Sequence, residues 1–102
     1  MSPESKKIID FHFGAYRRQG AKGYRRKQYG RLLNIINDIF DHEPSAQGKL
    51  DRIGRKQIIG YWCRTEDETE KTRIEKWRVL AILFKALKKP SPPRPRKKCR
   101  AH

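Results

Sequence analysis

The stretch that decides the fold is Lys22-Gly-Tyr-Arg-Arg-Lys-Gln-Tyr-Gly-Arg-Leu-Leu-Asn-Ile-Ile-Asn-Asp-Ile-Phe-Asp-His42. Its apolar side chains recur three or four residues apart, which is the spacing of one helix face, while charged side chains fall mainly elsewhere. That apolar set is Tyr29, Leu32, Leu33, Ile36, Ile39 and Phe40. Pro44 stops the pattern, because the residue before a proline avoids the helical region. The sequence therefore predicts a long amphipathic helix over about 22–42.

Two further helical patterns flank the long helix, one before it and one after the polar loop that follows it. Residues 4–16 place Ile9, Phe13 and Tyr16 on one face, and a glycine-bearing loop is expected to follow. That loop is marked by Gly14, Gly20 and Gly23. Residues 45–54 form the polar loop, and residues 55–63 are expected to form a short helix.

The last helical pattern covers about 71–88. Thr69 and Thr72 are the candidates for its N-cap, and Thr72 with Glu75 has the form of a capping box. Its apolar stripe is wide enough to indicate burial against several helices rather than one. Pro90 ends it.

These patterns predict an all-α protein, a compact bundle of about four helices over residues 1–89. No segment has the alternating pattern of a strand. Residues 90–102 are rich in proline, lysine and arginine, and we expect them to form an extended or disordered basic tail.

The composition indicates a polyanionic partner. The 102 residues include 26 Lys and Arg against 11 Asp and Glu, a formal net charge of +15. Solubility does not need such an imbalance, whereas a polyanion binds to it by releasing counterions. Nucleic acid is favoured over an anionic membrane or an acidic protein.

The sequence also sets expectations for the compartment. There is no long apolar run and no signal peptide, so we expect no membrane association and a cytoplasmic location, on the nucleoid if the source is bacterial. Cys63 and Cys99 have no metal-site spacing and are expected to be reduced thiols. The isolated chain is expected to be a monomer.

Three basic clusters are candidates for nucleic-acid contact. The first combines cations with an interleaved tyrosine at a helix start, where backbone N–H groups favour phosphate. Its members are Arg17, Arg18, Lys22, Tyr24, Arg25, Arg26, Lys27 and Arg31. The alternative is a solvated helix face.

The second cluster opens the last helix and could reach a major groove. It consists of Lys71, Thr72, Arg73 and Lys76, followed by Arg78. Glu70 and Glu75 leave open the alternative of ordinary surface ion pairs. The third cluster, in the tail, comprises Arg94, Arg96, Lys97 and Lys98.

Catalytic and metal chemistry have little support in the sequence. His12, His42 and His102 are scattered, and no glycine-rich phosphate loop is present. The acidic residues around His42 lie at a helix end, where exposure to solvent is the usual state. We therefore expect no enzyme activity, no metal and no cofactor.

In this helix order the chain resembles the N-terminal, SAM-like core-binding domain of tyrosine recombinases, the phage-type integrases, over about residues 10–90. The resemblance is carried by the segments starting at Tyr24, Ile53 and Glu70, including Thr72 before the apolar Leu80, Leu83 and Phe84. It implies that the second and fourth helices approach the major groove, while a separate catalytic domain grips the other face of the duplex. Neither His12 nor His42 is followed by arginine at the third position, so that domain's His-x-x-Arg motif is absent. A catalytic domain or another recombination protein would then be a partner.

The function predicted from these features is binding of double-stranded DNA. Two alternatives stay open. One is an RNA-binding or ribosome-associated basic protein, although most aromatic residues fit apolar stripes and leave Tyr24 as the main exposed one. The other is a protein-interaction adaptor, with Pro92-Pro-Arg-Pro95 as a proline-rich ligand.

Overall fold

The computed structural model describes residues 3–18 and 22–95, with the backbone alone for residues 14–18, 22 and 24. It contains four α-helices, α1 (Pro3–Arg18), α2 (Lys22–His42), α3 (Arg55–Arg64) and α4 (Glu70–Ala86). Two short 3₁₀ turns, η1 (Pro44–Ala46) and η2 (Leu50–Arg52), lie between α2 and α3. The described residues contain no strand. The prediction of a four-helix, all-α body is confirmed.

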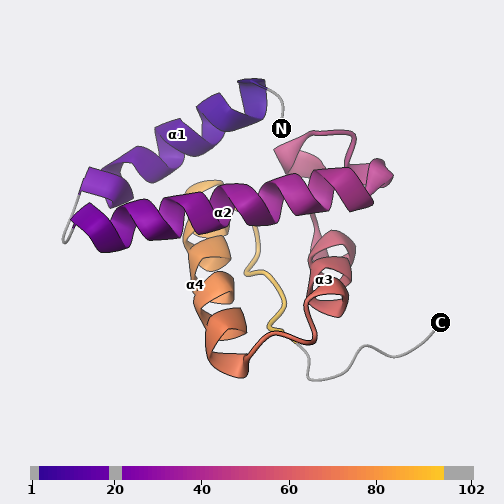
Figure 1. Ribbon diagram of the computed structural model, residues 1–102. Helices are drawn as coiled ribbons and strands as arrows, with labels where there is room; N and C mark the ends of the chain where they lie inside the picture. Colours follow the sequence, from indigo (N-terminus) through magenta and orange to yellow (C-terminus); the bar gives the residue numbers. More distant parts are fainter. Residues whose placement is uncertain (1–2, 19–21, 96–102) are drawn as a thin grey trace.

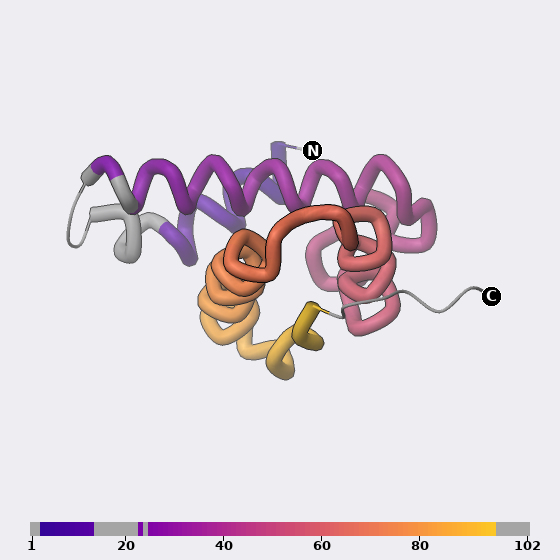
Figure 2. Tube along the Cα trace, turned by 60° about the horizontal axis from the view of Figure 1, so that its bottom comes forward, coloured from indigo at the N-terminus to yellow at the C-terminus, as the bar shows by residue number. Residues whose placement is uncertain are grey.

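Helix α2 is the element on which the other three pack. Figure 1 shows α1 alongside α2, with α3 near its carboxyl-terminal part and α4 crossing nearer its amino-terminal part. Figure 2, turned by 60°, shows α3 and α4 on the same side of α2. In both views the first turns of α2 extend past α4.

The core is built from the apolar stripes of all four helices, together with three side chains of the η1–η2 segment. Burial of these side chains is the main favourable term for a body of this size. The buried set is Ile9, Phe13, Leu32, Ile35, Ile36, Ile39, Ala46, Leu50, Ile53, Ile58, Tyr61, Trp62, Val79, Leu80, Leu83 and Phe84.

The η1–η2 segment turns through two consecutive residues with positive φ. Gln47 has a φ of 51° and Gly48 a φ of 67°, a region that costs little only for glycine. Ser5 Oγ donates a hydrogen bond to Gly48 O at 2.9 Å. This bond fastens the turn to the start of α1.

Helix α3 is joined to the end of α2 by one arginine. Arg64 donates from Nε to Asp38 Oδ1 at 2.9 Å and from Nη1 to Glu43 Oε2 at 2.8 Å. A Cβ at Gly60 would lie 2.6 Å from Glu43 Oε2, so a larger residue there would push aside the carboxylate end of Glu43. At the other end of α3, Gly54 N donates to Gln57 Oε1 at 2.9 Å.

The ends of α4 differ from the predicted ones. Thr69 alone is the N-cap, because its Oγ1 accepts a hydrogen bond from Thr72 N at 3.2 Å. Thr72 is the third helical residue, so the predicted capping box starting at Thr72 is wrong. The helix ends at Ala86, and Lys88, with a φ of 59°, turns the chain back.

Residues 90–95, here called the strap, return along the body between α3 and α4 (Figures 1 and 2). Trp77 Nε1 donates to Pro92 O and Trp62 Nε1 donates to Pro93 O, both at 2.9 Å. Within the predicted extended or disordered tail, the strap has no helix or strand but is held against the body, because both indoles find their acceptors there. Residues 96–102 lie outside the described residues.

The predicted loop after the first helix is shorter than expected. Gly14 lies inside α1 and Gly23 inside α2, so placing them in a loop is wrong. Helical glycine costs only about 1 kcal/mol, which the burial of neighbouring apolar residues outweighs. Gly20 lies outside the described residues.

The central position of α2 makes its buried leucine a test of the fold. Leu32 is fully buried, so Leu32→Ala should lower the free energy of unfolding by about 2–5 kcal/mol in urea denaturation. Asn34→Ala, on the exposed face of the same helix, should change it by no more than about 0.5 kcal/mol. Equal effects of the two substitutions would contradict this packing.

Candidate nucleic-acid interface

The first turns of α2 present two exposed cations, Arg26 and Lys27. Among the described residues, no ion pair joins either side chain to a carboxylate. Arg25, their neighbour, is half-buried. This part of α2 extends past α4, with α1 alongside it (Figures 1 and 2), so α4 does not block the approach of a long polyanion.

Arg31, the last cation of the first predicted cluster, forms an ion pair inside the protein. Its Nη1 lies 2.9 Å from Glu75 Oε2 and 3.2 Å from Gln28 Oε1. The pair with Glu75 joins α2 to α4 and is mostly shielded on the arginine side. A phosphate would have to displace a carboxylate to reach it.

Arg73 is buried and does not belong to a surface site. It is 5% exposed, its Nη2 donates to Trp62 O at 2.7 Å, and its guanidinium lies 5.8 Å from the Trp62 ring centre. This arginine fixes α4 against α3. We therefore remove Arg73 from the interface that the sequence predicts.

Lys76 is likewise held inside the fold. Its Nζ lies 2.8 Å from both carboxylate oxygens of Glu68 and 2.9 Å from Tyr61 Oη. Burial lowers the pKa of Lys76, but the hydrogen bonds to Glu68 and Tyr61 outweigh that effect and leave it raised. Its charge is already neutralised, so it too is removed from the interface.

The cations of α4 that do face solvent form a stripe along one side of the helix. Lys71, Arg78 and Lys85 are exposed and follow one another at intervals of seven residues, which is two helical turns. Thr72 is half-buried, and its hydroxyl accepts from that of Thr69 at 2.9 Å. Lys85 is the member that the sequence analysis missed, although the seven-residue interval was a visible signal.

The strap contributes one exposed cation, Arg94. Its guanidinium lies 4.5 Å from the centre of the Trp77 ring, within the range of a cation–π contact.

The other predicted contacts cannot be placed, because they lie outside the described side chains or residues. They are Arg17, Arg18, Lys22, Tyr24, Arg96, Lys97 and Lys98.

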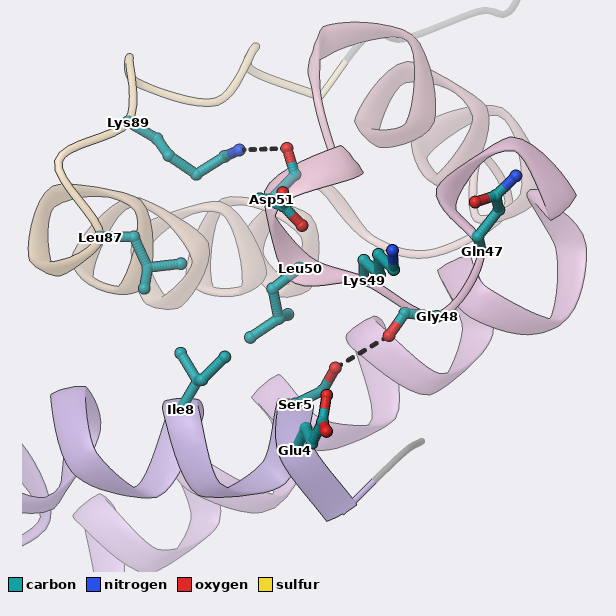
Figure 3. Close-up of a pocket in the computed structure, with 10 residues that line it drawn as sticks. All are labelled: Glu4, Ser5, Ile8, Gln47, Gly48, Lys49, Leu50, Asp51, Leu87 and Lys89. Atoms are coloured by element: carbon teal, nitrogen blue, oxygen red, sulfur yellow. Dashed lines mark hydrogen bonds between the residues drawn. The ribbon is translucent and has the colours of Figure 1, made fainter.

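A concavity next to the start of α1 is unsuited to phosphate. A cavity of about 480 Å³ lies between the start of α1, the η1–η2 segment and the end of α4, and Figure 3 shows its lining. It carries two lysines, Lys49 and Lys89, against two carboxylates, Glu4 and Asp51. Lys89 Nζ also donates to Asp51 O at 3.1 Å. With no excess positive charge, this cavity is not part of the candidate interface.

Helix α1 exposes an aromatic residue that the sequence analysis did not single out. Phe11 is 81% exposed, next to Ile8 at 41%. Phe11 lies midway between Ile9 and Phe13, which both point into the core, so helical geometry turns it outward. That offset of two residues was the available signal.

Cys63 differs from its expected state. It is disulfide-bonded in the structure, so the expectation of a reduced thiol is wrong for this residue. Cys99, the other cysteine in the sequence, lies outside the described residues.

The described residues contain no group of three or more potential metal ligands, and none of their helices has the length and apolar character needed to cross a membrane.

Comparison with known proteins leaves the family open. No protein-family model, no curated protein and no solved structure matches the chain. The resemblance to the core-binding domain of tyrosine recombinases therefore stays a prediction.

The pair of Tyr61 and Lys76 should make the fold sensitive to alkaline pH. Burial raises the pKa of Tyr61 above its usual 10.0, and that of Lys76 is raised above 10.5. The folded chain thus holds both protons more tightly than the unfolded chain. Their contribution to stability is complete below pH 10.0 and is lost as the pH rises through the raised values.

Urea denaturation measured at about pH 8 and about pH 11 checks this expectation. The free energy of unfolding should fall between the two, and it should fall less in Tyr61→Phe, which removes one of the titrating groups. A fall of equal size in Tyr61→Phe and the unsubstituted chain would contradict the assignment.

Proposed function

We propose that the chain binds double-stranded DNA, with the first turns of α2 as the main contact. One observation carries this proposal: Arg26 and Lys27 are exposed without a described carboxylate partner, at a helix start that extends past α4 and has only α1 alongside it. Cations in such a position can neutralise phosphates and release the counterions condensed on the DNA. Backbone N–H groups at a helix start favour phosphate as well.

The exposed stripe of α4 supports the proposal as a second contact. Lys71, Arg78 and Lys85 lie on one helix face, and a straight row of cations suits a backbone in which phosphates repeat regularly. Lysine binds phosphate as a point charge, whereas an exposed arginine such as Arg78 can also reach a base edge. We therefore assign mainly phosphate contacts to this surface, with limited reading of sequence.

The finer proposal is a core-binding module of the integrase type. It rests on the resemblance of the three segments described above, which would give the second and fourth helices to the major groove. The exposed cations of α2 and α4 are side chains that could contact DNA from the second and fourth helices, as that resemblance implies. Cleavage of DNA is not proposed for this chain.

Salt dependence of duplex binding tests the proposal. The logarithm of the affinity should fall linearly with the logarithm of salt concentration, by about 0.9 for each phosphate contacted. Arg26→Ala/Lys27→Ala should weaken binding and make that slope shallower by about 1.8, because two contacts are lost. Fluorescence anisotropy with a labelled duplex at several salt concentrations measures both quantities.

The matched control is Arg55→Ala/Lys56→Ala. Both residues are exposed, and the pair removes the same charge from α3, away from the start of α2 (Figure 1). It should lower affinity less and leave the slope close to that of the unsubstituted chain. Equal slopes for the two double variants would show that net charge alone drives binding and would contradict the proposed site. Preferential displacement by a duplex RNA of equal length would instead favour the RNA alternative.

A further inference from the structure

The strap is held by two tryptophans that act as a pair of fixed donors. Trp62 on α3 and Trp77 on α4 donate from Nε1 to the consecutive carbonyls of Pro93 and Pro92, each at 2.9 Å. Trp62 is 1% exposed and Pro92 is buried. A buried indole N–H that loses its acceptor is costly. The two rings therefore define a site with a strict requirement for two adjacent acceptors.

The same face recognises a cation. The Arg94 guanidinium lies 4.5 Å from the Trp77 ring centre, so one ring supplies both a donor at its edge and a π face for the next side chain along the strap. The contacts thus engage two consecutive backbone carbonyls, those of Pro92 and Pro93, and the arginine side chain that follows them.

The downstream end of the strap meets negative charge. Pro95 lines a hollow of about 260 Å³ together with Glu66, Glu68, Glu70 and Arg73, and Glu68 is already paired with Lys76. The three glutamates belong to the acidic run of residues 66–70, which leaves an excess of negative charge beside Pro95. A ligand that continues past this proline with positive charge is favoured there by charge complementarity.

The strap's contacts are all of a kind that a separate peptide can reproduce. Within the described residues, no backbone–backbone hydrogen bond joins residues 90–95 to a helix. The body supplies side-chain donors and rings, and the strap supplies carbonyls, prolines and one guanidinium. Proline-rich segments are already extended before they bind, so they lose little conformational entropy in an aromatic groove.

We propose that the strap-binding surface formed by Trp62 and Trp77 is a recognition site for proline-rich segments containing Pro-Pro-Arg-Pro, occupied in the free chain by its own strap as a built-in ligand. A partner protein that carries such a segment, followed by basic residues, binds this surface by displacing the strap. This site is independent of the proposed DNA contact, which lies on α2 and the outer stripe of α4. It also changes the adaptor hypothesis of the sequence analysis. There the chain supplies a proline-rich ligand, whereas here it supplies both that ligand and the surface that binds it.

NMR of the two indole N–H groups in the full chain tests the proposal. In Pro92→Gly/Pro93→Gly the carbonyls remain but the extended conformation is no longer pre-formed, so hydrogen exchange at both indoles should quicken by about tenfold. The free peptide Pro-Ser-Pro-Pro-Arg-Pro should then shift both indole signals saturably and slow their exchange again. The same peptide with alanine for arginine should bind at least about threefold more weakly, because the ring contact is lost.

Arg94→Ala provides a second variant that leaves the core untouched, because Arg94 is exposed. In this chain the Trp77 indole should exchange faster, while buried core amides such as that of Leu32 keep their protection. Two results would each overturn the proposal. One is an absence of peptide-induced shifts at both indoles in either variant at millimolar peptide; the other is equal binding of the arginine and alanine peptides.

Discussion

Scarcity of carboxylates is the constraint that shapes this protein. Eleven acidic side chains face 26 lysines and arginines, so most cations have no partner of opposite charge available. Three carboxylates form ion pairs between neighbouring helices. Glu75 joins α4 to α2 through Arg31, and Asp38 and Glu43 join α2 to α3 through Arg64. Most of the other described cations are exposed, and on α2 and α4 the exposed ones are Arg26, Lys27, Lys71, Arg78 and Lys85.

Helix α4 shows how one element divides its cations between two tasks. Arg73 and Lys76 point inward, where one holds the Trp62 carbonyl and the other bridges Glu68 and Tyr61. Lys71 and Arg78, only a few residues away in sequence, point outward. A cation that fixes a helix against its neighbours loses its availability to a ligand. The same helix thus uses inward-pointing cations for packing on one face and carries exposed cations on the other.

The helices could be predicted from periodicity alone, and α2 has the same ends in the structure as in the prediction. The inward position of Arg73 was also readable: it precedes Trp77 by four residues and Leu80 by seven, which places it on the apolar stripe. Its positive charge points to the surface, but its place on the apolar stripe decides its burial. The docking of the strap had no such signal, because the acceptors of Trp62 and Trp77 are backbone carbonyls of residues far along the chain, and sequence spacing does not reveal such pairs. The exposed cations at the start of α2 were predicted by composition, while the commitment of Arg31 to Glu75 depends on a contact between distant elements.

Trp62 connects three parts of the molecule, since its carbonyl accepts from α4, its ring lies over Arg73, and its indole donates to the strap. The strap follows all four helices along the chain, so a ribosome releases it after them. Only three residues separate it from α4, so it leaves the ribosome almost together with that helix. The hydrogen bonding of Trp62 on α3 is therefore complete only when the last described segment of the chain has docked.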